Sequence, residues 1–513
     1  MSTRFSLLDV ISRRVADETG TLRKEASLKV ALTYPSPYHV GMSSLGFQAI
    51  YREIHQHRDV CVERVFLPDD VDAWKALRLA PVSEETQTPL SDFHVIAFSV
   101  AYEPEITGLF ELLTMAGIEP LREKRGPRAP LIVAGGPLTF SNPDPLEPFI
   151  DVLVQGEAED TIHTLLDAVT GSTNGVAGVR ESLKATPGFR VPGLSSESTR
   201  FSVFKTADER LPARSAIVTP HTELRNMFLI EPERGCSRGC HYCVMRRTTN
   251  GGMRTVPPER ILELIPPDAK RVGLVGAAVT DHPKIVQLLE TLVNAGREVG
   301  VSSLRADRLT QPLVNALKAG GAQTLTVASD GASQRMRDLV DRKHSETQIV
   351  NAAQMAKIAG IKRLKIYNVI GVPLETDDDI DELVRFTIEL SRILPVALGV
   401  APVAAKRNTP LDGSPFAGIP TVESRLERLR KGLRGRAELR PTSARWAWVE
   451  YMMAQCGPEG GLAAYEAWQN GGAFVAWKKA FAATNCRPHE ARRTVDGRRK
   501  ATEWPSLGLK AAS

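Results

Sequence analysis

The chain has 513 residues, of which 42% are hydrophobic and 24% charged, an ordinary composition for a soluble globular protein. Its 65 basic and 60 acidic side chains give a net charge of +5, which permits an anionic substrate or nucleic acid without requiring one. Six cysteines in this length exclude a disulfide framework, and no apolar run approaches the roughly 20 residues that a membrane helix needs.

The N-terminal segment lacks the apolar core of a signal peptide, because charged residues such as Arg4, Asp9 and Arg14 interrupt it. We therefore expect a lead segment over 1–27 and a cytoplasmic protein that is not exported. The sparse use of cysteine fits a reducing compartment and a metal or redox role.

Residues 28–190 alternate short apolar runs with amphipathic stretches such as 103–117. Each apolar run ends in Gly, Pro or polar residues, which is typical of a parallel sheet covered by helices on both faces. Ligands of such sheets bind beyond the carboxyl ends of the strands. We therefore predict a Rossmann-like α/β domain over 28–190. Its strands are expected at 28–35, 94–100, 129–136 and 149–160.

A segment rich in Pro, Gly and Ser at 184–200 predicts a linker, which we place at 191–225. A second α/β series runs over 226–415. Two of its helices have clear starts, since Ser345 opens a capping box and Thr376 precedes three aspartates. At least five consecutive β/α units predict a full or partial parallel barrel, whose chemistry sits at the carboxyl ends of its strands. Strands are expected at 271–279, 299–303, 324–328, 363–371 and 396–402, the last ending the series.

The region 416–513 is predicted to be helical with a loosely ordered basic tail, and 421–440 and 460–483 read as helices. Residues 425–440 carry seven basic and two acidic side chains, and 487–500 carry six and two. Such runs can bind phosphates, but aromatic residues for base stacking are sparse here. A solvated helix face and a basic tail are therefore favoured over an RNA partner.

Three cysteines lie within eight residues of the stretch "ERGCSRGCHYCVMRR": Cys236, Cys240 and Cys243. The stretch follows 227–235, which predicts a strand running into a tight glycine loop. Such a loop can turn three thiolates toward one point, where they hold three irons of a 4Fe–4S cubane and leave the fourth iron open. The alternative is zinc, with a fourth ligand from His241 or a distant cysteine, although the His241 side chain is expected to diverge from its neighbours.

The spacing C-x3-C-x-aromatic-C, matched by these cysteines and Tyr242, resembles the signature of the radical S-adenosylmethionine (radical SAM) enzymes. The resemblance implies that the three cysteines ligate a 4Fe–4S cluster whose open iron binds the amino and carboxylate groups of SAM. One electron from an external reductant of the flavodoxin or ferredoxin type then cleaves SAM to methionine and a 5′-deoxyadenosyl radical. This chemistry belongs to the cofactor, which the protein positions and shields.

Four later segments follow the order of the SAM-binding segments of that family. They resemble a glycine-rich segment for the SAM amino group, a polar strand end for the ribose or carboxylate, an acid for the ribose, and an apolar residue with a glycine over the adenine. The aromatic ring of the cysteine loop would also contact the adenine, with no role for its hydroxyl. The alternative for these residues is turn formation and helix capping. The implied SAM contacts are Tyr242, Gly276, Ala277, Ser303, Arg305, Asp330, Ile370 and Gly371.

An α/β domain ahead of a radical SAM barrel resembles the cobalamin-binding subgroup, here in an uncharacterised branch related to methylthiotransferase-like radical SAM proteins. The resemblance implies that a corrin rests on loops bearing Gly135, Gly136 and Gly156. The alternative is an inherited fold used for substrate or partner contact. Histidine-ligating cobalamin domains carry D-x-H-x-x-G, but here Ala97 stands in the glycine position three residues after His94. We read His94 as a strand residue, so cobalamin would bind without it.

The sequence thus predicts a radical SAM enzyme and leaves its reaction class open. With cobalamin we expect methyl transfer to an unactivated carbon. Without it, hydrogen abstraction would lead to rearrangement, oxidation or sulfur insertion, including methylthiolation of RNA. A cluster-bearing binding or sensing protein is the non-enzymatic alternative. Among the remaining cysteines, Cys61 is expected in the core, and Cys456 and Cys486 as ordinary thiols rather than ligands of a second cluster.

Overall fold

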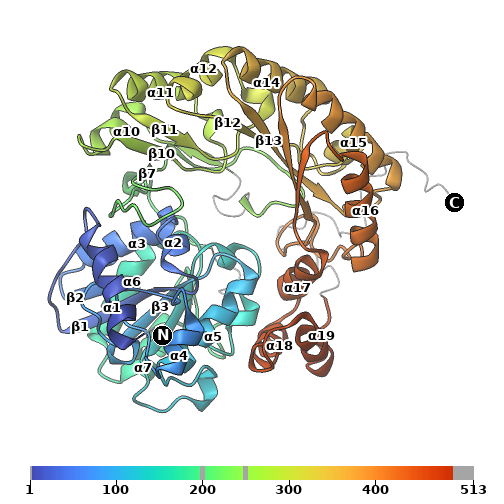
Figure 1. The fold of residues 1–513 in the computed structure, drawn as a ribbon. Helices are drawn as coiled ribbons and strands as arrows, with labels where there is room; N and C mark the ends of the chain where they lie inside the picture. The colour runs from blue at the N-terminus through green and yellow to red at the C-terminus, as the bar shows by residue number, and fades with distance from the viewer. Residues whose placement is uncertain (1–2, 197–202, 246–251, 489–513) are drawn as a thin grey trace. The chain divides into compact units, whose positions relative to one another are not determined.

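The computed structural model describes the chain except for residues 1–2, 197–202, 246–251 and 489–513. The chain divides into two compact units, whose elements are labelled in Figure 1. Within the described residues, no helix combines the length and the apolar character needed to cross a membrane. The first unit comprises Met1–Ser237, Arg247–Ser302 and Thr310–Ala322, and the second comprises Arg238–Arg246, Ser303–Leu309 and Gln323–Ser513.

The first unit contains a six-stranded sheet in the order β2-β1-β3-β4-β5-β6, parallel except for the β5–β6 pair. The order 2-1-3-4-5 is one of the two common orders of doubly wound α/β sheets. All four predicted strands are present, whereas β2 and β6 were not predicted. The strands are β1 (Leu28–Tyr34), β2 (Val60–Phe66), β3 (Val95–Ser99), β4 (Leu131–Gly135), β5 (Val152–Val154) and β6 (Phe189–Arg190).

The sheet is buried because its strands are apolar along most of their length, and in β2 every residue is buried. An aromatic group fills part of the core, with the Phe47 ring centroid 5.6 Å from that of Tyr34 and 5.4 Å from that of Phe66. The helices of this unit are α1 (Arg4–Ala16), α2 (Tyr38–Gly41), α3 (Leu45–Gln56), α4 (Val71–Ala76), α5 (Ile106–Met115), α6 (Ala158–Gly171), α7 (Gly175–Leu183), α10 (Pro258–Leu264), α11 (Ile285–Asn294) and α12 (Gln311–Ala319).

A buried ion group ties the N-terminal lead segment to this sheet. The guanidinium of Arg64, on β2, donates to Glu18 Oε1 at 2.7 Å and to Glu85 Oε1 at 2.6 Å, and the side chains of Arg64 and Glu18 are fully buried. Burial raises the pKa of Glu18, but the charge and hydrogen bonds of Arg64 outweigh this effect and the pKa is lowered. The lead segment is thus an ordered helix followed by an anchored turn.

The same unit contains a parallel three-stranded sheet in the order β11-β10-β7 and an antiparallel pair, β8 with β9. The single strand predicted at 227–235 is two short strands, because Pro232 has no N–H to continue the ladder. The strand predicted at 271–279 is present but stops at Leu274. The strands are β7 (Phe228–Ile230), β8 (Glu233–Gly235), β9 (Met253–Thr255), β10 (Arg271–Leu274) and β11 (Glu298–Val301).

The second unit is built on a parallel four-stranded sheet in the order β12-β13-β14-β15. The predictions at 324–328 and 396–402 match β12 and β14 to the residue. Two predictions fail at β15: the series does not end at β14, and 421–440 is not helical throughout. The chain leaves the preceding helix through Gly435, whose φ is +71°. The strands are β12 (Thr324–Ala328), β13 (Arg363–Ile370), β14 (Val396–Pro402) and β15 (Glu438–Pro441).

The predicted helix starts of this unit are confirmed. The Ser345 hydroxyl accepts from the Gln348 N–H, and the Gln348 side chain accepts from the Ser345 N–H. At the next helix, the Asp379 side chain accepts from the Thr376 N–H.

The strands expected to form a barrel occur as parallel sheets of three and four strands, one in each unit. The helices of the second unit are α13 (Gln334–Leu339), α14 (Glu346–Ile358), α15 (Asp377–Ser391), α16 (Ile419–Gly432), α17 (Ala444–Gln455), α18 (Pro458–Gln469) and α19 (Phe474–Ala483).

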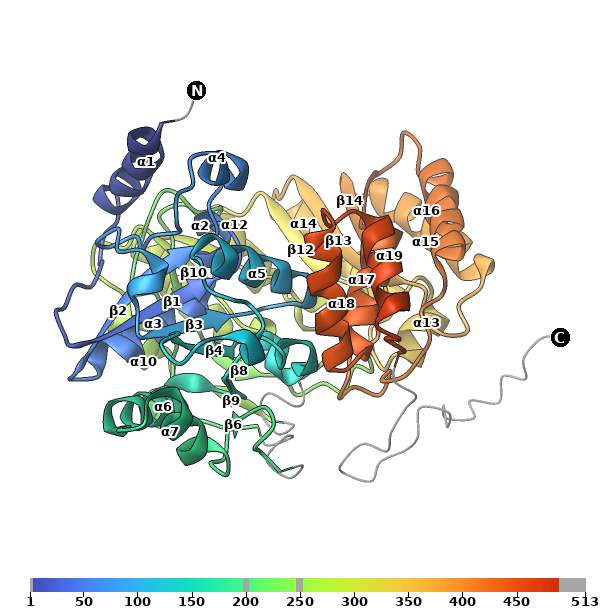
Figure 2. The same cartoon turned by 90° about the horizontal axis from the view of Figure 1, so that it is seen from below.

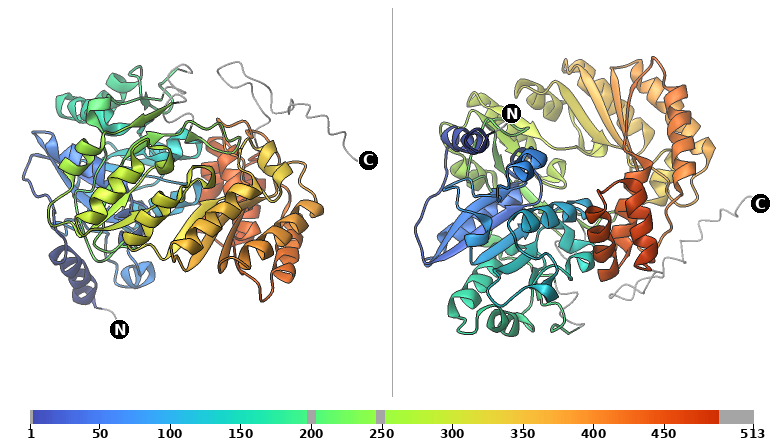
Figure 3. Two further views of the ribbon diagram at one scale, coloured as in Figure 1. Left: turned by 90° about the horizontal axis from the view of Figure 1, so that it is seen from above. Right: turned by 60° about the horizontal axis from the view of Figure 1, so that its bottom comes forward.

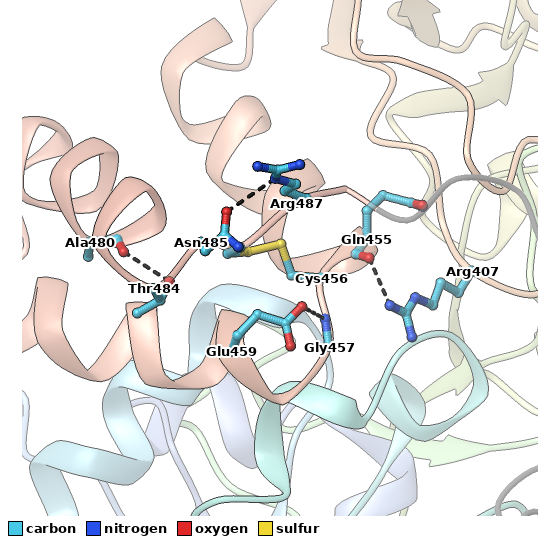
Figure 4. Close-up of a disulfide and its surroundings, with 10 residues drawn as sticks. Arg407, Gln455, Cys456, Gly457, Glu459, Ala480, Thr484, Asn485 and Arg487 are labelled. Atoms are coloured by element: carbon cyan, nitrogen blue, oxygen red, sulfur yellow. Dashed lines mark hydrogen bonds between the residues drawn. A yellow bond between two sulfur atoms is a disulfide. The ribbon is translucent and has the colours of Figure 1, made fainter.

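The last three helices, α17, α18 and α19, pack together (Figure 2 and Figure 3). A disulfide joins Cys456, which follows α17, to Cys486, which follows α19, with the two Cα atoms 5.9 Å apart (Figure 4). The prediction that these residues are ordinary thiols is therefore wrong. A separation of 30 residues offers no local spacing from which the pairing could be read. Cys61 is buried, as predicted.

Candidate active site

The cysteine loop begins where β8 ends at Gly235, whose φ of +95° favours glycine and turns the chain. Cys240 is buried, with 5% of its surface exposed, whereas Cys236 and Cys243 are partly exposed. None of the three is disulfide-bonded. The predicted turn from strand to glycine loop is thus present, and no covalent bond removes any of the three sulfurs from metal binding.

Backbone pairing holds the second half of the loop. The N–H of His241 donates to the Val340 carbonyl at 3.0 Å, and the carbonyl of His241 accepts from the Leu411 N–H at 3.1 Å. The ring of Tyr242 packs on a small apolar cluster of this unit. The loop between Cys240 and Cys243 is therefore fixed by both its backbone and its aromatic side chain. The apolar cluster is formed by Met336, Leu339, Val340 and Val372.

A chain of polar contacts leads from Tyr242 to a cysteine sulfur. The hydroxyl of Tyr242 donates to Asp330 Oδ2 at 2.8 Å, and Arg342 Nε lies 3.1 Å from the same oxygen. Arg342 Nη1 then donates to Cys240 Sγ at 3.8 Å. Burial and the Asp330 carboxylate raise the pKa of Tyr242, so its hydroxyl keeps its proton. The three side chains thus link the loop to the end of β12 and to the segment after α13.

These contacts bear on two expectations about the loop. The Tyr242 hydroxyl, to which the sequence assigned no role, is a donor to Asp330. The assignment of Asp330 to the SAM ribose stays a prediction, and its engagement with Tyr242 and Arg342 does not favour it. Asp330 adopts a φ of +54°, a left-handed conformation that is uncommon outside glycine. Sequence spacing could not have linked these residues.

Asp307 lies among a second group of basic side chains beside the loop. Its carboxylate lies 2.6 Å from Arg305 Nη2, 2.5 Å from Arg238 Nη2 and 2.6 Å from His344 Nε2. Burial raises the pKa of Asp307, but its contacts with His344 and Arg238 outweigh this effect and the pKa is lowered. Arg305, predicted to bind the SAM ribose or carboxylate, is thus engaged with Asp307, and its contact with SAM stays a prediction.

Glu233 is a buried carboxylate that sequence analysis missed. It lies on β8, where its Oε1 accepts from the Ala278 N–H at 2.6 Å. A Cβ added to Gly276 would come 2.2 Å from the same oxygen, so a larger residue there would displace the Glu233 carboxylate. Burial raises the pKa of Glu233 to about 7, although the bond from Ala278 acts the other way. The packing against Glu233 thus accounts for a glycine at 276 without SAM. The neighbouring Ala277 is exposed.

The remaining predicted SAM contacts differ in exposure. Ser303 is exposed, whereas Ile370 is fully buried at the end of β13. Gly371 has a φ of +78°, and its N–H donates to Glu375 Oε1 at 2.7 Å. Arg425 Nη1 binds the same oxygen at 2.8 Å. Gly371 is therefore required by a turn that Glu375 and Arg425 hold, and the contacts of these residues with SAM stay predictions.

The glycines predicted to carry a corrin lie at the carboxyl ends of two strands, where doubly wound sheets bind ligands: Gly135 ends β4, Gly136 follows it, and Gly156 follows β5. Gly136 and Gly156 have φ of +99° and +104°, and an added Cβ would lie 2.7 Å from the Val100 oxygen and 2.4 Å from the Phe204 oxygen, respectively. Gly135 differs, because the nearest atom to an added Cβ would be 3.5 Å away. Two of the three glycines are thus fixed by backbone geometry alone.

His94 lies at the amino ends of the strands of this sheet, and the loops that bear these glycines lie at the carboxyl ends. It directly precedes β3, its N–H donates to the Lys29 carbonyl at 3.0 Å, and its Nδ1 accepts from the Lys29 N–H at 3.1 Å. These are contacts at the amino ends of β1 and β3, away from the carboxyl-end loops. The interpretation of His94 as a residue of the strand region and not a cobalamin ligand agrees with this position.

Ion pairs engage much of the basic stretch 425–440. Besides the bond from Arg425 to Glu375, Arg428 Nη2 lies 2.5 Å from Asp381 Oδ2. This pairing fits a solvated helix face better than a surface kept for phosphate. The second basic stretch, 487–500, lies outside the described residues except for 487 and 488.

Two family profiles match consecutive parts of this chain. The profile described as "Radical SAM proteins, N-terminal" matches residues 46–192, and the profile described as "Radical SAM superfamily" matches residues 230–387. The second match includes the cysteine loop and β10–β13. The first covers most of the six-stranded sheet.

Similar proteins include a methyltransferase. An uncharacterized protein of Methanocaldococcus jannaschii is 27% identical over 399 residues, covering 75% of this chain and 80% of that protein. The 2-(S-pantetheinyl)-carbapenam-3-carboxylate methyltransferase of Streptantibioticus cattleyicolor is 24% identical over 331 residues, 58% of this chain and 46% of that enzyme.

Among solved structures, the radical SAM methyltransferase TsrM of Kitasatospora setae, with cobalamin and a [4Fe-4S] cluster bound, superposes with a TM-score of 0.51. The match covers 78% of this chain and 75% of TsrM at 14% identity, so it speaks for the fold. Together with the cysteine signature and the two profiles, it supports one conclusion. The chain belongs to the radical SAM superfamily, whose enzymes use a 4Fe–4S cluster and SAM, and it is an enzyme of that superfamily.

Proposed function

We propose that Cys236, Cys240 and Cys243 hold a 4Fe–4S cluster, that SAM binds at its open iron, and that the enzyme is a cobalamin-dependent methyltransferase. The observation that carries the cluster assignment is the buried Cys240 sulfur, which lies 3.8 Å from the guanidinium of Arg342. This guanidinium gives one of the three cysteine sulfurs a hydrogen bond of the kind that iron–sulfur ligands receive. When bound, the cluster supplies the electron that cleaves SAM, and an external one-electron reductant must deliver that electron.

The cluster proposal is tested by anaerobic reconstitution with iron and sulfide. We expect about four irons and four sulfides per chain. Changing Cys236, Cys240 or Cys243 to Ala should abolish both the cluster and the formation of 5′-deoxyadenosine from SAM. Cys61→Ala is the matched control, because this cysteine is buried on β2 of the six-stranded sheet. The substitution should leave the cluster and the formation of 5′-deoxyadenosine unchanged. Stoichiometric zinc in an active preparation would contradict the proposal.

The cobalamin part of the proposal rests on the six-stranded sheet over 28–190. Its strand order matches a doubly wound sheet, and its glycine loops follow β4 and β5 at the ligand-binding edge. TsrM, whose fold is similar, is described with cobalamin bound. Within this proposal the corrin rests on Gly135, Gly136 and Gly156, and 226–415 forms the SAM-binding domain. The region that begins at 416 and holds α16–α19 and β15 follows it.

Two variants test where cobalamin binds. Gly135→Ala adds a Cβ with only ordinary contacts, so the sheet should fold while the added methyl group blocks close approach of a corrin. We expect at least tenfold weaker binding of hydroxocobalamin, measured by absorption of the bound cofactor after gel filtration. His94→Ala should bind it as wild type does, with spectra that lack a nitrogen ligand from the protein. Loss of binding in His94→Ala together with unchanged binding in Gly135→Ala would reverse the assignment.

A cobalamin-independent radical SAM enzyme is the second candidate, and one observation favours it. Gly136 and Gly156 are required by their own backbone geometry, so their presence needs no bound corrin. Hydrogen abstraction would then lead to rearrangement, oxidation or methylthiolation, with RNA as one substrate class. Cleavage of SAM at full rate in cobalamin-free protein, with no cobalamin taken up, would select this candidate.

A further inference from the structure

Arg342 is held from three directions in the second unit. Its Nη1 donates to Cys240 Sγ at 3.8 Å, its Nε lies 3.1 Å from Asp330 Oδ2, and its Nη2 donates to the Ala328 carbonyl at 3.2 Å. Only 11% of its side chain is exposed. A guanidinium with this many fixed contacts has little freedom to turn away from the sulfur, because its planar fork is already committed.

Asp330 and Tyr242 support this orientation. Asp330 accepts from the Tyr242 hydroxyl at 2.8 Å through the oxygen that also lies 3.1 Å from Arg342 Nε, so one carboxylate contacts both side chains. An arginine guanidinium stays protonated in folded proteins, and here the Asp330 carboxylate lies 3.1 Å from its Nε. The guanidinium therefore remains a cation beside the cysteine sulfur.

Two further arginines near the loop, Arg238 and Arg305, are arranged differently. Arg238 and Arg305 are both bound to the carboxylate of Asp307, which balances their charge. Arg342 shares its carboxylate with Tyr242 and still directs one N–H at Cys240. The sulfur of a predicted cluster ligand therefore faces a charged donor that the surrounding side chains hold in place.

We propose that Arg342 is a positioning residue that keeps a charge-assisted hydrogen bond on the Cys240 sulfur and thereby raises the reduction potential of the cluster. The inference rests on the proposed function, because it requires the cluster. One-electron reduction adds a negative charge to the cluster and its sulfurs. A nearby cation and a hydrogen bond stabilise that charge, and hydrogen bonds to the sulfurs are among the factors that set cluster potentials. The external reductant then needs less driving force.

The test compares the reconstituted full-length wild type with three variants: Arg342→Gln, Arg342→Lys and the control Arg385→Gln. Arg385 is an exposed arginine of α15 paired with Glu346. Iron and sulfide content establishes cluster loading, and a redox titration followed by electron paramagnetic resonance gives the midpoint potential. Arg342→Gln should lower the equilibrium constant for reduction at least tenfold, a shift of about 59 mV to more negative potential for one electron.

Arg342→Lys should shift the potential in the same direction but less, because a compact ammonium keeps a charge without reaching both Asp330 and the sulfur. Arg385→Gln should match wild type. If Arg342→Gln does not retain the cluster, Arg342→Lys decides by the same measurement. Unchanged potentials in loaded Arg342 variants would overturn the inference and leave the proposed function intact. Failure of wild type to load any cluster would overturn both.

Discussion

At the scale of single residues, Tyr242 contributes two separable interactions to the cysteine loop. Its ring packs on the apolar cluster that includes Met336 and Val340, and its hydroxyl donates to the Asp330 carboxylate. A phenylalanine keeps the first and loses the second, whereas an alanine loses both. The pair of substitutions therefore separates packing from hydrogen bonding.

We predict that Tyr242→Phe lowers the free energy of unfolding by about 1.5 kcal/mol, because the hydroxyl binds a charged acceptor. Tyr242→Ala should cost about 3–5 kcal/mol through the lost ring contacts. If the ring also contacts the adenine, the alanine variant should bind SAM roughly tenfold more weakly, following 1.4 kcal/mol per decade. Thermal unfolding and isothermal titration of SAM into loaded protein measure the two effects. A phenylalanine variant as stable as wild type would show that the hydroxyl bond is dispensable.

Glu233 predicts a pH dependence of stability. Its pKa is about 7 in the folded chain against an ordinary value of 4.5, so the folded state keeps a proton that the unfolded chain has released. The contribution is fully present below about pH 4.5 and is lost as the pH rises through about 7. Glu233→Gln keeps an acceptor for Ala278 without the charge. The fall in thermal midpoint from pH 6 to pH 8 should therefore be smaller in this variant.

The control for this prediction is Glu263→Gln, which alters an exposed glutamate whose side chain is 66% exposed. Its midpoints should fall with pH as those of wild type do. An identical fall in Glu233→Gln and wild type would place the proton elsewhere, for example on Glu84 or Glu375, whose pKa values burial also raises to about 7.

At the scale of elements, the lead segment is joined to the six-stranded sheet through one charge group. Glu18→Ala would leave the guanidinium of Arg64 buried with one carboxylate partner fewer, and breaking a buried pair in this way costs about 3–5 kcal/mol. We expect a lower thermal midpoint and faster proteolysis of α1. Asp9→Ala removes the partly exposed partner of the exposed Arg13 in the same segment and should change neither. Equal stability of the two variants would contradict the anchoring role.

Elements defined by local signals were predictable from the sequence. The helix starts at Ser345 and Thr376 follow from residues within one turn, and β12 and β14 follow from short apolar runs. Elements that depend on distant partners were not predictable. β15 exists because an edge of β14 is available to it, and β2 contains Arg64, which is buried only because Glu18 and Glu85 neutralise it.

In the candidate site, too, the local features were predictable from the sequence and the contacts between distant residues were not. The three cysteines and the aromatic residue between them are readable because they lie within one loop. The contacts that hold this loop join residues far apart, since Tyr242 and Asp330 are separated by 88 positions and Cys240 and Arg342 by 102. No periodicity or spacing reports such a pair, and only the folded chain relates them.

At the scale of the whole molecule, the proposed cofactors depend on different parts of the chain. The glycines proposed for cobalamin all lie in the first unit, whereas Cys240 and Cys243 lie in the second. We therefore predict that Cys240→Ala loses the iron–sulfur cluster but takes up hydroxocobalamin with unchanged affinity. Iron analysis and absorption spectra of the same sample measure both. Simultaneous loss of the two cofactors, in a variant that elutes as wild type does, would contradict independent loading.

The disulfide between Cys456 and Cys486 can be reduced during preparation of the enzyme. Iron–sulfur proteins are commonly prepared with an excess of thiol. Thiolates cleave disulfides through a mixed-disulfide intermediate. Both cysteines are buried, so a buffer chosen to protect the cluster would untether the end of α19 when local opening exposes the bond. Preparations with equal iron content could then differ by two titratable sulfhydryl groups, and a thiol count belongs beside each activity measurement.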